Sequence, residues 1–326
     1  MLRILTLLLL LVGLALAVGL AAGSSGWGYG TPDIVWHIRL PRVLAGFGAG
    51  SALALAGAVM QLLTRNPLAD PYVLGISGGA SVGALTVLWL GSAVGATALP
   101  EGGVAAGAAG GALVAAAVLF GLSWRVLGGS GVAATQESSV ALLLVGVMIG
   151  TACSALVSML LVLASDAQLR GMVFWLLGDL NGATQWSVAV LASVGALALV
   201  WPSAHELDWL ARGDAWAATL GVPVARRRRI ALGAAALATG AAVASAGAIG
   251  FVGLVVPHAL RLAGARAAPV LLPASALAGG AFVVLADAVA RTIVAPVQLP
   301  VGVLAAAVGV PAFLALLLHR PSGAHR

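Results

Sequence analysis

Residues 212–229, RGDAWAATLGVPVARRRR, form the only long polar interruption in a chain that is otherwise almost continuously apolar. Asp214 is expected to be a helix N-cap, because its side chain can accept a hydrogen bond from a free backbone N–H. Gly221 suits the left-handed conformation that ends a helix, and Pro223 blocks continuation. The stretch therefore predicts a short helix over residues 214–221.

So short a helix is not stable alone in water, and it must be held by neighbouring structure, by a partner, or by both. Trp216 and Leu220 are four residues apart and share one face. The four arginines at 226–229 mark this side of a membrane as cytoplasmic. We predict a surface helix that offers apolar side chains to another protein. An ordinary loop with one helical turn and an arginine stop signal is the alternative.

The composition indicates a membrane protein. The chain has 326 residues, of which 61% are hydrophobic and only 8% are charged, whereas a soluble protein carries roughly 25% charged residues. We predict an all-α polytopic membrane protein in which residues 1–326 form a single transmembrane domain. The net charge of +6 reflects membrane topology rather than nucleic-acid binding.

The sequence lacks the residues that several classes of enzyme require. There is no lysine, so the chain has no GxxxxGK[ST] phosphate-binding loop and cannot itself be a P-loop ATPase. The five histidines form no metal-ligand cluster, and neither GxSxG nor HExxH occurs. The single cysteine, Cys153, cannot form an intrachain disulfide. No catalytic residue, metal site or cofactor is predicted.

Apolar runs predict about ten transmembrane helices, which place both termini on the same side. The predicted spans are 2–22, 43–63, 74–90, 104–127, 138–164, 186–201, 230–249, 250–264, 270–291 and 299–319. The first could instead be a signal peptide, but its apolar run is longer than is typical of one. With cytoplasmic termini, twelve arginines lie inside and four outside, which fixes the orientation. The four outside are Arg39, Arg42, Arg170 and Arg291.

A faint internal repeat relates two halves of the chain. Residues 52–59 read ALALAGAV and residues 242–249 read AVASAGAI, and the two spans that carry them run in opposite directions. This pattern predicts an inverted repeat of the kind found in transporters. Chance similarity between alanine-rich and glycine-rich segments is the alternative.

The predicted spans contain almost no ionisable groups of the kind that couple transport to ions. Asp287 is the one acid inside a span, and Arg291 follows four residues later, so the two can pair. The energy source is therefore expected to lie outside this chain. Two alternatives are an ion-coupled secondary transporter that depends on Asp287, and a non-transporting membrane subunit of a larger enzyme.

Several long stretches, in order, resemble the FecCD/BtuC-type permeases of type II ABC importers, which import ferric siderophores, haem and cobalamin. The stretches are residues 39–42 (RLPR), 66–79 (NPLADPYVLGISGG), 138–146, 213–221, 250–258 (GFVGLVVPH) and 298–303 (QLPVGV). The resemblance implies a BtuC-like fold and a homodimer around one central pathway. It also implies two cytoplasmic ATP-binding cassette subunits and a periplasmic substrate-binding protein as partners in the inner membrane.

The resemblance also implies roles for particular residues. The ATPase subunits would dock on the short helix, and the expected contact residues are Asp214, Trp216, Leu220 and Gly221. Ala215 stands where the family commonly has a second acid, so the polar part of this contact is expected to differ. The arginines expected to dock acidic residues of the binding protein are Arg39, Arg42 and Arg291. Snorkelling to lipid headgroups is the alternative for these arginines.

The cytoplasmic gate of the family is formed by the loop between spans two and three and by the start of span five. The matching residues are Asn66, Leu68, Ser138 and Ser139. The sequence is thus interpreted as an inner-membrane permease subunit with both termini cytoplasmic and with no covalent chemistry of its own. It would import an iron chelate, which is haem or a ferric siderophore, or else cobalamin, by alternating access driven by a separate ATPase.

Overall fold

The computed structural model describes residues 2–24, 26–28, 30–93, 102–126, 136–181 and 186–318. Within these ranges the chain is helical and has no strand, which confirms the all-α prediction. The first half contains α1 (Leu2–Ala21), α2 (Pro32–Ile34), η1 (Val35–Arg39), α3 (Leu40–Thr64), η2 (Pro71–Leu74), α4 (Ile76–Ala93), α5 (Gly103–Val126) and α6 (Gln136–Leu163). The second half contains α7 (Asp166–Leu176), α8 (Trp186–Val200), η3 (Trp201–Ser203), α9 (Ala204–Arg212), α10 (Asp214–Thr219), α11 (Val224–Ala246), α12 (Val252–Leu262), α13 (Ala268–Thr292) and α14 (Val301–Leu318).

In the described part of the chain, apolar helical segments lie near the predicted spans. Among the described residues, 7 helices are long and apolar enough to cross a membrane. Three shorter apolar helices, Ile76–Gly91, Val252–Leu262 and Val301–Ala315, complete the series. Helix α11 begins at Val224, before the predicted start at 230, because the arginine run is itself helical and arginine is a good helix former. The inverted repeat stays a prediction.

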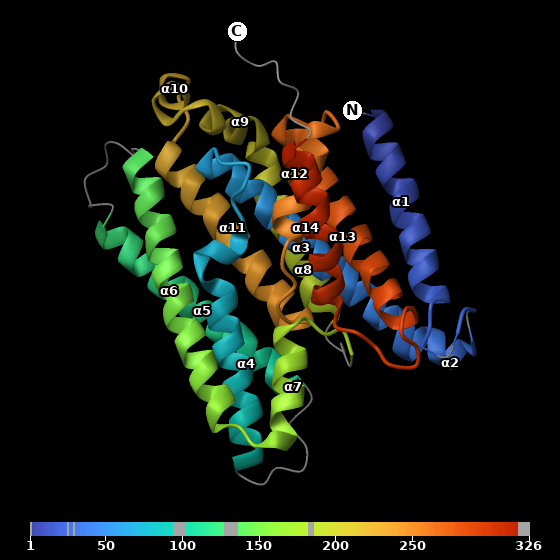
Figure 1. The fold of residues 1–326 in the computed structure, drawn as a ribbon. Coiled ribbons are helices and arrows are strands. Elements are labelled where there is room, and N and C mark those ends of the chain that lie inside the picture. The colour runs from blue at the N-terminus through green and yellow to red at the C-terminus, as the bar shows by residue number, and fades with distance from the viewer. Residues whose placement is uncertain are drawn as a thin grey trace.

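The helices form a bundle with two distinct ends (Figure 1). The start of α1, the end of α14 and the short helices α9 and α10 lie together at one end, which we call the α10 end. Helices α2 and α7 lie toward the opposite end, which we call the α2 end. The arrangement agrees with an even number of crossings, which returns the chain to the side where it began.

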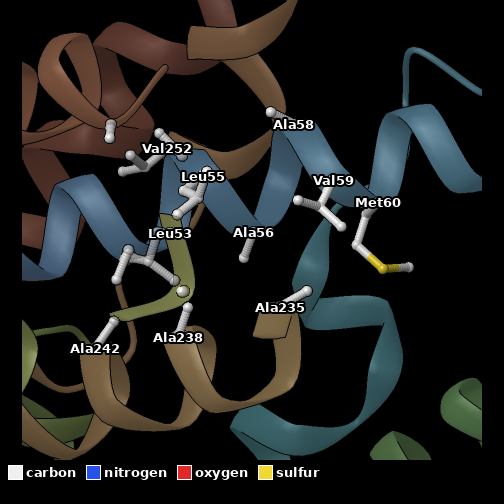
Figure 2. Packing of buried hydrophobic residues seen from close by; sticks show 14 of the residues in the cluster. Leu53, Leu55, Ala56, Ala58, Val59, Met60, Ala235, Ala238, Ala242 and Val252 are labelled. Carbon is white, nitrogen blue, oxygen red and sulfur yellow. The ribbon is translucent and has the colours of Figure 1, made fainter. Parts of the chain in front are cut away.

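Helix α3 is the centre of the bundle and is buried along most of its length. It packs against α8, α11, α12 and α13. Figure 2 shows the contact with α11, where Ala235, Ala238 and Ala242 face the leucines and valine of α3. These alanines are three and four residues apart, so they form one narrow face that lets the two helix backbones come close.

Glycines let several helices touch backbone to backbone. A Cβ added to Gly57 of α3 would lie 1.9 Å from the carbonyl oxygen of Gly253 in α12. A Cβ on Gly83 of α4 would lie 2.0 Å from the carbonyl oxygen of Gly107 in α5. Because lipid tails are as apolar as leucine, close packing rather than the hydrophobic effect holds such helices together.

The contact between α4 and α5 gives a matched pair of substitutions. In Gly111→Ala the new methyl group would lie 2.1 Å from the carbonyl oxygen of Gly79, which the native packing cannot accommodate. We expect the unfolding free energy to fall by roughly 1–3 kcal/mol, the usual cost of overpacking. Gly110 is next in the same helix with nothing within 4 Å of its added Cβ. Gly110→Ala is therefore expected to be neutral or slightly stabilising. Thermal unfolding of both variants in detergent is the measurement, and an equal loss in the two would contradict the packing assignment.

Two short helices at the bundle ends extend beyond the predicted spans. Helix α9 was not predicted, although Leu207 and Leu210 lie on its buried side while its other side is polar. The carboxylate of Asp208 in α9 accepts the backbone N–H of Ala268 at 2.8 Å, which fixes α9 to the start of α13. Helix α7 lies between the fifth and sixth predicted spans.

Candidate coupling and docking sites

Residues 214–219 form the short helix α10, as the sequence of residues 212–229 predicts (Figure 1). It ends in a Schellman motif, in which the N–H of Val222 donates to the Ala217 carbonyl (3.1 Å) and that of Gly221 to the Ala218 carbonyl (3.0 Å). Gly221 has a φ of 80°, which confirms the expected left-handed conformation. Residues 214–219 are therefore helical, and the partner contact that separates the two interpretations stays a prediction.

The prediction that Asp214 caps this helix was wrong. Gly213 is the N-cap, with a φ of 149° and a ψ of 138°, and Asp214 is the first helical residue. The Asp214 carboxylate instead accepts hydrogen bonds from the guanidinium groups of Arg65 and Arg228, the latter at 3.0 Å. Bonds between two ionised groups are stronger than a neutral capping bond, so the carboxylate turns toward the arginines.

Contacts with neighbouring residues explain how a helix of only six residues is stable. Arg65 also donates to the Leu210 carbonyl in α9 at 3.1 Å, so one guanidinium ties α9 to α10. The Arg212 guanidinium carbon lies 5.5 Å from the centre of the Trp216 ring, within the range of a cation–π interaction. Ala217 is fully buried beneath them. The helix is therefore fixed to the bundle before any partner binds.

Trp216 and Leu220 form an exposed apolar pair on this fixed helix. Their exposed fractions are 42% and 48%, although both are large apolar side chains. Asp214 and Gly221 serve the geometry of the helix, through the arginine contacts and the Schellman turn respectively. Of the four residues predicted to dock an ATPase, Trp216 and Leu220 thus present the accessible apolar surface, and their docking role stays a prediction.

The loop between α3 and α4 carries two of the predicted gate residues. The side chain of Asn66 accepts the backbone N–H of Leu68 at 2.9 Å, and both residues are exposed. The predicted partners Ser138 and Ser139 lie in the first turn of α6, and their side chains are outside the described part of the structure. The loop does reach α6 further along, because a Cβ on Gly75 would lie 2.7 Å from the Gly146 carbonyl oxygen. The gate role stays a prediction.

Asp70 in the same loop gives a pH-dependent prediction. Burial raises the pKa of its carboxyl to about 6 from an ordinary 3.8, although the carboxylate accepts the Tyr72 N–H at 2.8 Å. Between these values the folded protein binds more protons than the unfolded chain, so the free energy of unfolding falls as the pH rises from 4 to 6. The fall is up to about 3 kcal/mol. Asp70→Asn keeps the acceptor and is expected to remove this slope in thermal unfolding measured from pH 4.5 to 7.5. An unchanged slope would contradict the assignment.

A buried charge cluster lies at the α2 end. Arg42 of α3 binds Asp287 of α13 through Nε (3.1 Å to both carboxylate oxygens) and Nη2 (2.8 Å to Oδ1). Its Nη1 donates to Asn181 Oδ1 at 2.5 Å and to Gln298 Oε1 at 2.7 Å. Arg291 Nε lies 3.0 Å from Asp287 Oδ2, which confirms the predicted pair. The cluster therefore joins α3, α13 and the loops that follow α7 and α13.

Arg39 and Arg291 bind the end of α1. Arg39 donates to the carbonyls of Leu20 (2.7 Å), Ala21 (3.1 Å) and Gly28. Arg291 donates to the carbonyls of Ala22 at 2.8 Å and Gly19 at 3.0 Å. The last carbonyls of a helix lack intrahelical partners and carry its negative end, which favours a cation there.

The three arginines predicted to dock a binding protein are thus bonded inside the subunit. Arg39, Arg42 and Arg291 are only 6%, 9% and 3% exposed. Their internal bonds explain why these three arginines lie on the outer side of the membrane, where the positive-inside rule makes arginine uncommon. Snorkelling to lipid headgroups is not needed to explain it. Their contact with a binding protein stays a prediction. Sequence reasoning missed Asn181 and Gln298, because these loop amides lie 139 and 256 residues from Arg42 along the chain.

The fold and the two ends define a class of protein. A bundle of apolar helices surrounds a buried α3, a rigid short helix displays an apolar pair at one end, and an ion cluster locks the other. Within the described ranges, no group of three or more histidine, cysteine or acidic residues could hold a metal ion. These are the features of a multi-pass membrane permease.

The comparisons with known proteins identify the family. Residues 2–319 match the FecCD transport family. The chain is 40% identical over 324 residues to the vitamin B12 import system permease protein BtuC of Escherichia coli O17:K52:H18, covering 97% of this chain and 95% of that protein. The BtuC protein of Shigella sonnei gives the same identity and coverage. The chain therefore belongs to the FecCD transport family and is a permease subunit of a type II ABC importer, a multi-pass inner-membrane protein.

Solved structures agree with this assignment. One, described as an inward-facing conformation of a metal-chelate type ABC transporter, has a TM-score of 0.82 at 26% identity and covers 98% of this chain and 99% of its own. A second, PsaBC from Streptococcus pneumoniae in complex with Fab, shares the fold with a TM-score of 0.57 at 18% identity, over 89% and 94% of the two chains.

Proposed function

We propose that this chain is the translocating subunit of a cobalamin importer, driven by a separate ATPase. The choice of cobalamin as substrate is supported by the 40% identity to vitamin B12 permeases over nearly the whole of both chains. A ferric chelate or haem is the second candidate, favoured by the likeness to a metal-chelate type transporter. The cytoplasmic location of both termini is part of the proposal and is supported by the arginine distribution.

The proposed ATPase contact is the exposed pair on α10. Trp216 and Leu220 present apolar surface on a helix that Arg65 and Arg228 already fix in place. A preorganised anchor loses little conformational entropy on binding, which favours a contact that must transmit force. Two ATPase subunits would bind the two copies of α10 in a homodimer.

The proposed binding-protein contact is at the α2 end. Arg42 and Arg291 pair with Asp287, and Arg39 binds carbonyls at the end of α1, so positive charge is in excess among these four residues. The net positive charge of these arginines can attract an acidic partner without direct contact, and salt weakens such long-range attraction. Gating by Asn66, Leu68, Ser138 and Ser139 completes the alternating-access proposal.

The substrate is tested by ATP hydrolysis in nanodiscs that contain the permease and its ATPase. Binding protein loaded with cobalamin, haem or a ferric hydroxamate would be added in turn, at low and at high salt. We expect stimulation by the cobalamin-loaded protein, and a half-maximal concentration that rises with salt. Stimulation by haem or a ferric chelate alone would reject cobalamin and leave the importer assignment intact.

A further inference from the structure

A strongly basic cleft of about 460 Å³ lies at the α10 end, outside the docking and gate residues. Its walls come from the end of α3 and the following loop, from α9, and from the connection between α12 and α13. The charged residues that line it are Arg65, Arg212, Arg261, Arg266 and Asp208. Four arginines against one acid leave an excess of positive charge in a confined space.

The acid and two of the arginines already have partners within the chain. Asp208 accepts the Ala268 N–H at 2.8 Å, Arg65 binds Asp214, and Arg212 stacks on Trp216. Arg261 differs, because its Nη2 atom is buried without a hydrogen-bond partner. Burying an unsatisfied donor is costly, and more so for a charged group. The cleft therefore contains a charged donor that lacks an acceptor.

Gln61 shows that the deep wall of the cleft is polar as well. Its Nε2 donates to the Leu254 carbonyl at 3.1 Å, while its Oε1 is buried without a partner. An anion that also carries a hydroxyl group could satisfy both the Arg261 donor and the Gln61 acceptor. A phosphodiester with a hydroxyl-bearing headgroup such as glycerol has this chemistry, and arginine prefers phosphate oxygens because its planar fork binds two of them together.

The surroundings of the cleft place it at the depth of lipid headgroups. Leu262, next to Arg261, is half-exposed. Trp201 is also half-exposed, and its indole N–H donates to the Pro269 carbonyl at 3.0 Å, three residues after Arg266. Tryptophan with an exposed apolar ring and a bonded N–H is typical of the membrane–water interface. Arginine pockets between helices at the cytoplasmic side recognise anionic headgroups.

We propose that this cleft binds the phosphate of an anionic phospholipid from the cytoplasmic leaflet. The proposal rests on the orientation given under the proposed function, and it is independent of the substrate. Arg65 both lines the cleft and holds Asp214 of α10. A bound headgroup would therefore lie against the same guanidinium that fixes the helix proposed to receive the ATPase.

The test uses the purified permease alone in neutral detergent, followed by intrinsic tryptophan fluorescence during heating. Dioctanoyl-phosphatidylglycerol, dioctanoyl-phosphatidylcholine and inorganic phosphate are titrated separately. The variants are Arg266→Gln and the double variant Arg261→Gln/Arg266→Gln. Arg229→Gln is the matched control, because Arg229 is an exposed arginine of α11, in the basic run beside α10, and does not line the cleft.

We expect phosphatidylglycerol to raise the melting temperature of the native protein and of Arg229→Gln. Its apparent affinity should fall about 10-fold or more in the double variant and by a smaller factor in Arg266→Gln. An equal response to phosphatidylcholine would show apolar binding only, and an equal response to inorganic phosphate would show a soluble-anion site. Either result, the absence of any shift, or unchanged affinity in the variants would overturn the proposal.

Discussion

Trp216→Asp/Leu220→Asp is expected to abolish ATP-dependent uptake while the permease still folds. Both side chains are large, apolar and close to half exposed on α10, so their replacement removes partner contact rather than core packing. A tryptophan at the centre of an interface is commonly worth 2 kcal/mol or more, and burying a new carboxylate there adds a further cost. We therefore expect the affinity for the ATPase subunits to fall by roughly 30-fold or more.

The measurement combines co-purification of the ATPase with uptake by reconstituted vesicles. Ala218→Asp is the matched control, because Ala218 is exposed on the same helix and points away from Trp216 and Leu220. The control should retain most of the ATPase. Normal uptake and a normal ATPase content in the double variant would remove α10 from the coupling route.

Asp287→Ala is expected to cost about 3–5 kcal/mol of stability, because it leaves buried arginines without their counter-ion. Asp287 is only 2% exposed and lies between Arg42 and Arg291, at 2.8 Å and 3.0 Å. Its loss removes the attraction and leaves two like charges facing each other. We expect little monodisperse protein, and a lower melting temperature for what is obtained.

Two further variants show that the effect is electrostatic. Asp166→Ala removes an exposed acid at the start of α7 and should leave the melting temperature unchanged. Arg42→Gln/Asp287→Asn removes one charge of each sign and should recover part of the loss. If Asp287→Ala were fully folded but inactive in transport, Asp287 would act as a coupling acid, and the ion-coupled alternative would regain support.

Local signals in the sequence were sufficient to predict the apolar helices and the short helix α10. Hydrophobic length located the apolar segments, and Gly221 with Pro223 fixed where α10 ends. Each of these features depends on residues a few positions apart, so they could be predicted from the chain order.

Features that depend on distant residues were missed or misread. Asp214 has the residue type of an N-cap, and only the fold brings Arg65 from 149 residues away to compete for its carboxylate. The burial of Arg39, Arg42 and Arg291 was not foreseen, because the carbonyls and amides that bury them come from α1 and from two loops. Helix α9 was overlooked because it follows a membrane span with hardly a break.

The most direct test of an importer driven by a separate ATPase is uptake of labelled cobalamin by proteoliposomes. They would contain the permease and its ATPase, with the binding protein added on the side of the α2 end. We predict uptake only when ATP and binding protein are both present. Uptake by the permease alone, without ATP and driven by an ion gradient, would contradict this mechanism.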